Sequence, residues 1–337
     1  MDCLPVELVT EVAFLACTDG GLTGCSLSLV SKRIRDAVYP ARFHTVALAS
    51  DPEAFSKFLD VYREQRHRLP DTTPRVRHLF LSLLPIEGEP IYRRPRPLLH
   101  NAIRAYEEHL RNLRDLGERH GAAVCALMQE LAPDLETFTF IRGEWKNVPA
   151  VDCTFPRLRE LTILDGMPEF LRLEDSSQSM FPRLERLHAV EFFHARPLDL
   201  CQFSQHASHL THFRCSGMHY VDTVTMGSLR LVTGRLSSED ESLLLPHLRQ
   251  VVVQPTLMKY HGDLHGPNRL CVELKACAGK ARSGMYFHIC AQHNTLGPID
   301  TREETDTAPE RCIRKAREEW MQRVEGGSGC WAEEYLF

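Results

Sequence analysis

"FPRLRELTI" (residues 155–163) and "FPRLERLHA" (residues 181–189) are two nearly identical stretches from the middle of the chain, and they indicate its fold. In each stretch a leucine follows the Phe-Pro-Arg lead-in, and apolar residues stand three and five positions after that leucine. Alternation of this kind places the last two apolar side chains on one face of a β-strand. A single strand cannot bury that face alone, so we expect several copies to stack in one register and share a core.

The frame apolar-x-x-apolar-x-apolar occurs six times along the chain, beginning at Val76, Leu135, Leu158, Leu184, Leu210 and Leu248. The four frames from Leu135 to Leu210 begin 23, 26 and 26 residues apart, a spacing typical of repeat architectures. The pattern resembles the leucine-rich repeats in an irregular form, because the Asn or Cys that follows the core frame in that family is missing here. The resemblance implies a solenoid whose strands line a concave binding surface.

The rest of the chain supplies further elements. Its periodicities predict strands at residues 42–48, 270–277 and 284–292, and helices at residues 50–65, 102–116, 122–132 and 308–324. We therefore expect an α/β chain of three parts: a small N-terminal helical module at residues 1–42, an irregular leucine-rich-repeat-like array at residues 43–294 with a helical insert at about 98–132, and a final part at residues 295–337. This final part is expected to hold a loose linker, a helix that caps the open end of the array, and a flexible tail.

Composition limits the classes of partner. The 337 residues carry a formal net charge of −5, which offers no basic footprint, so we expect no nucleic-acid partner. No apolar run is long enough to cross a bilayer and the N-terminus lacks a signal-peptide pattern, so we expect no membrane association. Twelve cysteines are scattered without a CxxC pair, which predicts reduced thiols in the cytoplasm or nucleus.

The first 48 residues carry a second signal. Leu4-Pro5, Glu7-Leu8 and Val12 are followed by "LSLVSKRIRD" at residues 27–36 and "YPARFHTVAL" at residues 39–48. Together these motifs resemble the F-box, particularly the version common in fungal proteins, although the Gly-rich loop at residues 18–24 departs from its usual pattern. The resemblance implies a compact three-helix module that binds the Skp-type adaptor of cullin-RING ubiquitin ligases. The adaptor-facing or module-core positions that it implies are Leu4, Pro5, Leu8, Val12, Val30 and Ile34.

These two resemblances together imply a substrate-recognition subunit of an SCF-type ubiquitin ligase. The N-terminal module would hold the adaptor, and through it a cullin scaffold, while the repeats would hold an unknown target protein. Such a subunit performs no bond chemistry and needs no cofactor. The outward-facing candidates for target binding are Arg159, Glu160, Thr162, Glu185, Arg186, His188, Thr211, His212, Arg214, Arg249 and Gln250.

Three alternatives stay open from the sequence. The apolar stripe of the first helix could pack against the chain's own repeats, and the outward positions could be an ordinary solvated sheet face. The protein could then be a repeat-based interaction scaffold without ligase function. The third alternative is an enzyme, but the sequence contains no GxSxG elbow, P-loop, GxGxxG or HExxH motif, so we expect no catalysis.

One histidine-rich segment has a spacing that metal sites can use. "HASHLTH" places His206, His209 and His212 at intervals of three, with Cys201 and Cys215 on either side. On a helix this spacing could gather zinc ligands. Leu210 lies on the repeat frame, however, so the segment should pass from loop to strand and point its histidines in different directions. We therefore expect no metal.

Overall fold

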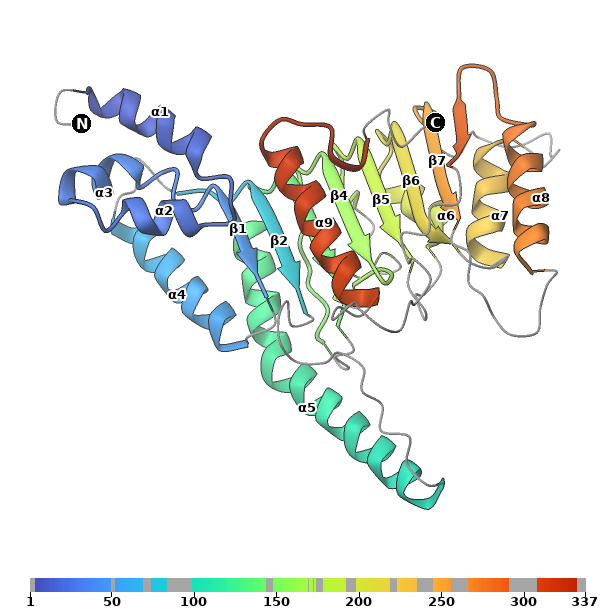
Figure 1. Cartoon of the computed structure of the whole chain (residues 1–337), viewed down its shortest axis with the longest axis horizontal. Helices are drawn as coiled ribbons and strands as arrows, with labels where there is room; N and C mark the ends of the chain where they lie inside the picture. The colour runs from blue at the N-terminus through green and yellow to red at the C-terminus, as the bar shows by residue number, and fades with distance from the viewer. Residues whose placement is uncertain are drawn as a thin grey trace, which may run out of the picture. The chain divides into compact units, whose positions relative to one another are not determined.

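The described residues form eight parallel strands with helices before, between and after them, and the protein has an α/β fold (Figure 1). The strands follow one another across the sheet in the order of the sequence, from β1 to β8. None of the helices within the described part of the chain is long and apolar enough to cross a lipid bilayer. The computed structural model describes residues 4–49, 52–68, 74–83, 99–143, 148–168, 170–171, 173, 178–191, 198–218, 223–234, 245–255, 266–290 and 308–331.

The elements have the following bounds. The strands are β1 (Thr45–Leu48), β2 (His78–Ser82), β3 (Thr137–Ile141), β4 (Glu160–Leu164), β5 (Arg186–Val190), β6 (His212–Met218), β7 (Gln250–Pro255) and β8 (Tyr286–Ile289). The helices are α1 (Val6–Ala16), α2 (Leu22–Leu27), α3 (Lys32–Val38), α4 (Pro52–Arg68), α5 (Leu99–Leu131), α6 (Leu200–His206), α7 (Thr223–Val232), α8 (Gly266–Ala278) and α9 (Ala308–Val324).

The predicted architecture, a separate F-box-like module followed by a leucine-rich-repeat solenoid and a capping helix, is wrong. The finding that overturns it is the all-parallel sheet of eight strands with helices interleaved along the chain. The repeat spacing holds only in the middle of the sheet. Elsewhere successive strands begin 33 to 59 residues apart, which leaves room for the crossover helices that parallel strands require.

Contacts divide the chain into two compact units. Unit 1 comprises Met1–Cys153, Glu169–Leu171 and Pro309–Gly329, and unit 2 comprises Thr154–Pro168, Arg172–Ala308 and Cys330–Phe337. These bounds differ from the expected domains, because the N-terminal helices share unit 1 with β1–β3. Helix α9 also belongs to unit 1, where Trp320 contacts Phe80 of β2 with ring centroids 5.5 Å apart.

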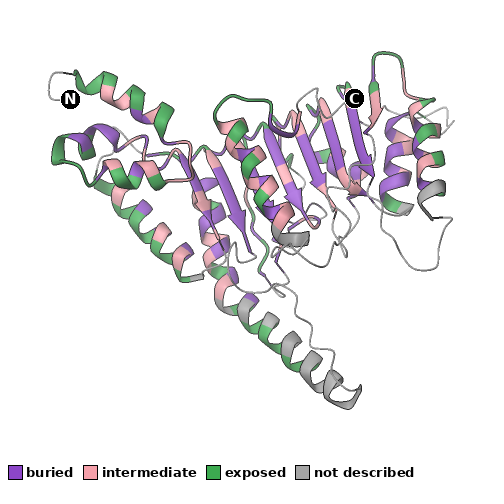
Figure 2. Cartoon of the chain, in the orientation of Figure 1, coloured by how far each residue is buried: buried purple, intermediate pink, exposed green. Residues whose placement is uncertain are grey.

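Unit 1 is a three-stranded parallel sheet covered by helices. Leu79 pairs in register with Val46 on one side and with Phe138 on the other, and all three side chains are buried on the same face. Helices α4 and α5 pack together, and Phe55, Leu59, Tyr62, Val124, Leu127, Met128 and Leu131 are their buried side chains (Figure 2). The helix predicted at residues 50–65 is thus confirmed by α4, although residues 50 and 51 lie outside the described residues. The two helices predicted in the insert form one helix, α5.

The N-terminal helices are built onto the edge of this sheet. Their core consists of Ala13, Cys17, Ile34, Val38 and Ala41. The Gly-rich loop then ties them to β1, because the N–H of Ala47 donates to the carbonyl of Gly20 over 3.1 Å. Gly20 has a φ of +82°, and a Cβ placed there would stand 2.8 Å from the Cβ of Ala47. This loop therefore needs glycine for both its backbone conformation and its close approach.

Unit 2 repeats one turn before successive strands. The N–H of the first frame leucine donates to the carbonyl three residues earlier, as from Leu158 to Phe155 (3.3 Å), and the same bond recurs before β5, β6 and β7. The four frame leucines are buried, and so are Leu161 and Ile163, which confirms the burial expected of the frame. Behind the turns, Phe181 stacks between Phe155 and Phe203, with centroids 5.4 Å from each.

Two further expectations for the C-terminal half need correction. Residues 270–277 were predicted as a strand but lie in helix α8, where Leu270, Leu274 and Cys277 form the buried stripe. The strand predicted at residues 284–292 is confirmed in its centre by β8. The helix predicted at residues 308–324 is confirmed by α9, but the tail after it is not free, because Cys330 is buried.

The glycine loop gives a testable prediction. Substitution Gly20→Ala should lower the free energy of unfolding of unit 1 by more than about 1–2 kcal/mol, since left-handed strain alone accounts for that much. The matched control is Gly326→Ala, because Gly326 has a similar φ of +88° in the same unit and no atom within 4 Å of the position that a Cβ would take. Urea titration of both variants checks this. Equal losses would show that the contact with Ala47 contributes nothing.

Two buried histidines give a second prediction. Burial, helped by the positive charge of Arg77, lowers the pKa of His44 to about 4. Burial, helped by the charges of His44 and Arg77, lowers the pKa of His78 to about 3. The rings lie 4.8 Å apart, and Nδ1 of His78 is 2.9 Å from the hydroxyl of Thr137. The unfolded chain, with pKa values near 6.5, binds more protons between pH 6.5 and 4. The free energy of unfolding should therefore decrease as the pH is lowered from 6.5 to 4, by about 1.4 kcal/mol per pH unit for each histidine. Above pH 6.5 these two histidines should cause no pH dependence.

Urea unfolding at pH 7, 6, 5 and 4.5 measures this slope. His78→Gln should reduce it, whereas His67→Gln, a change at an exposed position of α4, should leave it unaltered. A slope that is the same in all three proteins would contradict the assignment to the buried pair.

Candidate functional site

Helix α1 has apolar side chains on two opposite sides. On its inward side Ala13 lies in the core of the N-terminal helices, and Val9 and Phe14 pack against that core. Its outward side presents Leu8, Val12 and Leu15, which are 52%, 60% and 80% exposed (Figure 2). A helix that is apolar all round is normally buried on all sides. Within the described residues of unit 1, one side of α1 therefore lacks the cover that its composition calls for.

Other exposed apolar side chains lie close to α1 in the sequence. The described residues include twelve large hydrophobic side chains that are exposed, and eight of them fall within residues 4–30. We call these eight the N-terminal apolar surface: Leu4, Val6, Leu8, Val12, Leu15, Leu22, Leu29 and Val30. Single exposed apolar residues are ordinary, but such a concentration makes this surface a candidate interaction site.

Hydrogen bonds hold this surface in place. The guanidinium of Arg33 donates to the carbonyl of Leu4 over 2.6 Å, and Nε of Arg35 donates to the carbonyl of Ser28 over 2.8 Å. The carboxylate of Asp19 accepts from the backbone N–H of Thr23 over 2.9 Å and so caps α2. Both ends of the surface are thus fixed before any partner arrives, which lowers the entropy lost on binding.

The expected adaptor-facing residues divide into two groups. Leu4, Pro5, Leu8, Val12 and Val30 are exposed, whereas Ile34 lies in the helical core and is inaccessible to a partner. Among the described residues of unit 1, the stripe of α1 is exposed and does not pack against its own chain. Val6, Leu15, Leu22 and Leu29 are surface residues that were not predicted. The signal for Val6 and Leu15 was that apolar residues occupy both sides of α1.

The expected target-binding face lies on the polar side of strands β4–β7 in unit 2. Its members fall into three classes of exposure. Arg159 and Arg249 are exposed, and the partly exposed members are Thr162, Glu185, Arg186, Thr211, His212 and Gln250. Glu160, His188 and Arg214 are only 6%, 3% and 2% exposed. The interpretation of these last three as a free surface must therefore be corrected.

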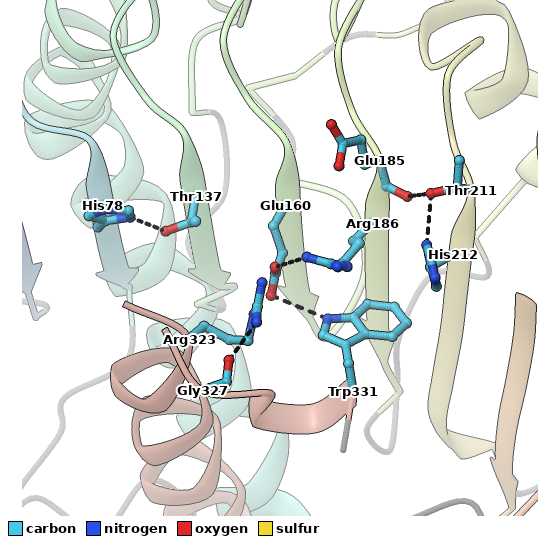
Figure 3. A network of polar contacts seen from close by, with 10 residues as sticks. All are labelled: His78, Thr137, Glu160, Glu185, Arg186, Thr211, His212, Arg323, Gly327 and Trp331. Atoms are coloured by element: carbon cyan, nitrogen blue, oxygen red, sulfur yellow. Dashed lines mark hydrogen bonds and ion pairs between the residues drawn. The ribbon is translucent and has the colours of Figure 1, made fainter. Parts of the chain in front are cut away.

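The chain's own C-terminal segment covers these three side chains. The indole N–H of Trp331 donates to a carboxylate oxygen of Glu160 over 3.2 Å, as Figure 3 shows, and Arg214 donates to the carbonyl of Cys330. The Trp331 ring also meets the ring of His212 edge-on, with centroids 5.9 Å apart. Burial, with the nearby charge of Arg186, lowers the pKa of His212, so its ring is neutral at pH 7.

The histidines of "HASHLTH" have separate partners. His206 is buried and bonded to the carbonyls of Leu173 and Gln178, while exposed His209 stacks on His247. His212 turns to the sheet face instead. As expected, this segment does not bring its histidines to one point.

The cysteines show no activated thiol among those with a resolved shift. The eleven cysteines of the described residues are all free thiols. Burial raises the pKa of Cys17 to about 11 and that of Cys153 to about 12. These thiols stay protonated at neutral pH, so they are poor nucleophiles and serve as small apolar side chains.

Comparisons with known proteins add no relative to this picture. No protein-family model, no curated protein and no solved structure matches the chain significantly. The N-terminal apolar surface and the polar face of unit 2 are therefore the observations on which a function has to rest.

Proposed function

We propose that this protein is a substrate-recognition subunit of a cullin-RING ubiquitin ligase. In this proposal the N-terminal apolar surface binds a Skp-type adaptor, and unit 2 binds a target protein. The observation that carries it is the exposed side of α1 with Leu8, Val12 and Leu15, on the segment whose motifs resemble the F-box. A compartment that contains such ligases, the cytoplasm or the nucleus, follows from the same proposal.

The energetics require several anchors at once. Complete burial of one Leu or Val side chain yields about 1.5–3 kcal/mol, and association costs about 4–15 kcal/mol. Burial of two or three side chains yields about 3–9 kcal/mol, which falls short of the upper part of that cost. Burial of all eight side chains of the surface yields about 12–24 kcal/mol, which exceeds most of it. Binding should therefore depend steeply on the loss of any two of them.

The proposed role involves no bond chemistry by the chain itself. A protein that holds the adaptor with one unit and a target with the other raises the concentration of the target near a ubiquitin-loaded enzyme. The division of the chain into two compact units suits such a role, since each unit can offer its own binding surface. A chain that binds targets but no adaptor would instead be an interaction scaffold.

Charge placed on the exposed side of α1 tests the proposal. The double variant Leu8→Asp with Val12→Asp should bind a purified Skp-type adaptor about 100-fold more weakly than the wild type, because two anchors contribute about 3 kcal/mol or more. Isothermal titration calorimetry measures the affinity. The thermal midpoint should change little, since both side chains are exposed.

Two further variants serve as controls. Val272→Asp introduces the same charge at a position of α8 that is 65% exposed, and it should leave adaptor binding unchanged. Ile34 lies in the core of the N-terminal helices. The variant Ile34→Asp should therefore unfold these helices, with loss of helical circular dichroism. If the wild-type chain binds no adaptor at micromolar concentration, the ligase proposal is wrong. The interaction scaffold without ligase function is then the remaining proposal.

A further inference from the structure

The polar face of unit 2 contains charged groups that a sheet does not need for its own folding. Glu160 of β4 and Arg214 of β6 are almost fully buried, and so is the polar ring of His188 between them on β5. Charged side chains are seldom buried unless specific partners compensate for their lost hydration. The partners of these groups therefore indicate what the face is built to hold.

One part of the face holds an indole ring. A carboxylate oxygen of Glu160 accepts from the Trp331 N–H, and the other lies 3.6 Å from the guanidinium of Arg186. The rings of His188 and His212 approach the indole at 65° and 75°, with centroids 6.4 Å and 5.9 Å away. Figure 3 shows His212 beside the indole of Trp331. Edge-to-face contacts of this kind are favourable for aromatic rings. A phenylalanine ring could make them, but it would leave Glu160 without the N–H.

A second part of the face holds a main-chain carbonyl. Arg214 donates to the carbonyl of Cys330, and its guanidinium also donates to the side-chain oxygen of Gln254 over 2.8 Å. Its Nε donates to the hydroxyl of Ser216 over 3.1 Å. The strand residues thus orient Arg214 by themselves, and the carbonyl that it binds can come from any residue.

From these contacts we infer that the face formed by Glu160, His188, His212 and Arg214 is a recognition site for a tryptophan-bearing peptide segment of a partner protein. The chain's own Cys330 and Trp331 are the occupant in this structure. Contact with one side chain supplies selectivity and contact with one carbonyl supplies sequence-independent affinity, which is how peptide-binding sites work. The inference goes beyond adaptor binding and does not depend on it.

The geometry of the occupant suits an exchangeable ligand. The segment that leads to it is glycine-rich, and Gly326 and Gly329 both have positive φ, a conformation that glycine enters and leaves at little cost. Trp331 itself is only partly buried. The bonds from Arg186 to Glu160 and from Arg214 to Gln254 do not involve the segment, so they can persist when it leaves.

An internal occupant competes with an external peptide. A segment tethered by a short linker has an effective concentration in the millimolar range, so the site of the wild-type chain should be largely closed to weak ligands. Removal of the Trp331 side chain should open it. A partner peptide should then bind at least about 10-fold more tightly than to the wild type, as the population of open sites rises.

Fluorescence polarisation with the full chain tests this inference. The probe is a labelled peptide with the sequence of residues 326–332, "GGSGCWA". It should bind the Trp331→Ala chain at least about 10-fold more tightly than the wild type. A probe with phenylalanine at the tryptophan position should bind the same variant at least about 10-fold more weakly, because the hydrogen bond from the indole N–H to the buried carboxylate of Glu160 is then not formed.

Further variants guard against a folding artefact. Trp331→Phe keeps the ring packing but not the N–H, so it should fold as the wild type does and bind the probe with intermediate affinity. Adding Lys275→Ala to Trp331→Ala should change nothing, because Lys275 is an exposed residue of α8 in the same unit and belongs to neither proposed binding surface. The inference is overturned if neither Trp331 variant binds the probe better than the wild type, or if the tryptophan and phenylalanine probes bind alike.

Discussion

The arrangement of unit 2 depends on one backbone contact that recurs before successive strands. The carbonyl of Arg159 accepts the N–H groups of both Glu185 and Arg186, at 2.9 and 3.0 Å. The carbonyl of Glu185 does the same for Thr211 and His212, and the carbonyl of Thr211 for the start of β7. Each contact fixes the register of the next strand. A shift by one residue would exchange the two faces of a strand. This backbone contact therefore determines which side chains become core.

A fixed register separates apolar from polar side chains over the whole of unit 2. Leu161, Leu187, Phe213 and Val251 line up on one face, which is the core. The same pairing brings charged and polar residues together on the other face. The buried charges there, Glu160 and Arg214, need partners that replace their lost hydration. Trp331 and the carbonyl of Cys330 provide part of that compensation. The polar face and the contacts of its occupant thus follow from the same backbone contact that fixes the register of the core.

The sequence predicted the strands better than their connections. The six frames coincide with β2–β7, because the frame reports the burial of a strand face, which is local. The architecture was mistaken because crossover length, and not the frame, distinguishes this α/β sheet from a leucine-rich-repeat solenoid. Leu270, Val272 and Leu274 alternate as in a strand, although Leu270 and Leu274 also fit the helix in which they lie. The place of Trp331 was not predictable, since its partner Glu160 is 171 residues away in the sequence.

The exposed side of α1 supports the proposed partner through its apolar area. The inward side of α1 packs Val9, Ala13 and Phe14 into or against the core of the N-terminal helices, while Leu8, Val12 and Leu15 face outward. Buried area determines the hydrophobic free energy, so these three outward side chains add little to the folding of the chain itself. In the proposed complex the adaptor would cover them, and the free energy that they do not contribute to folding would then be available for binding.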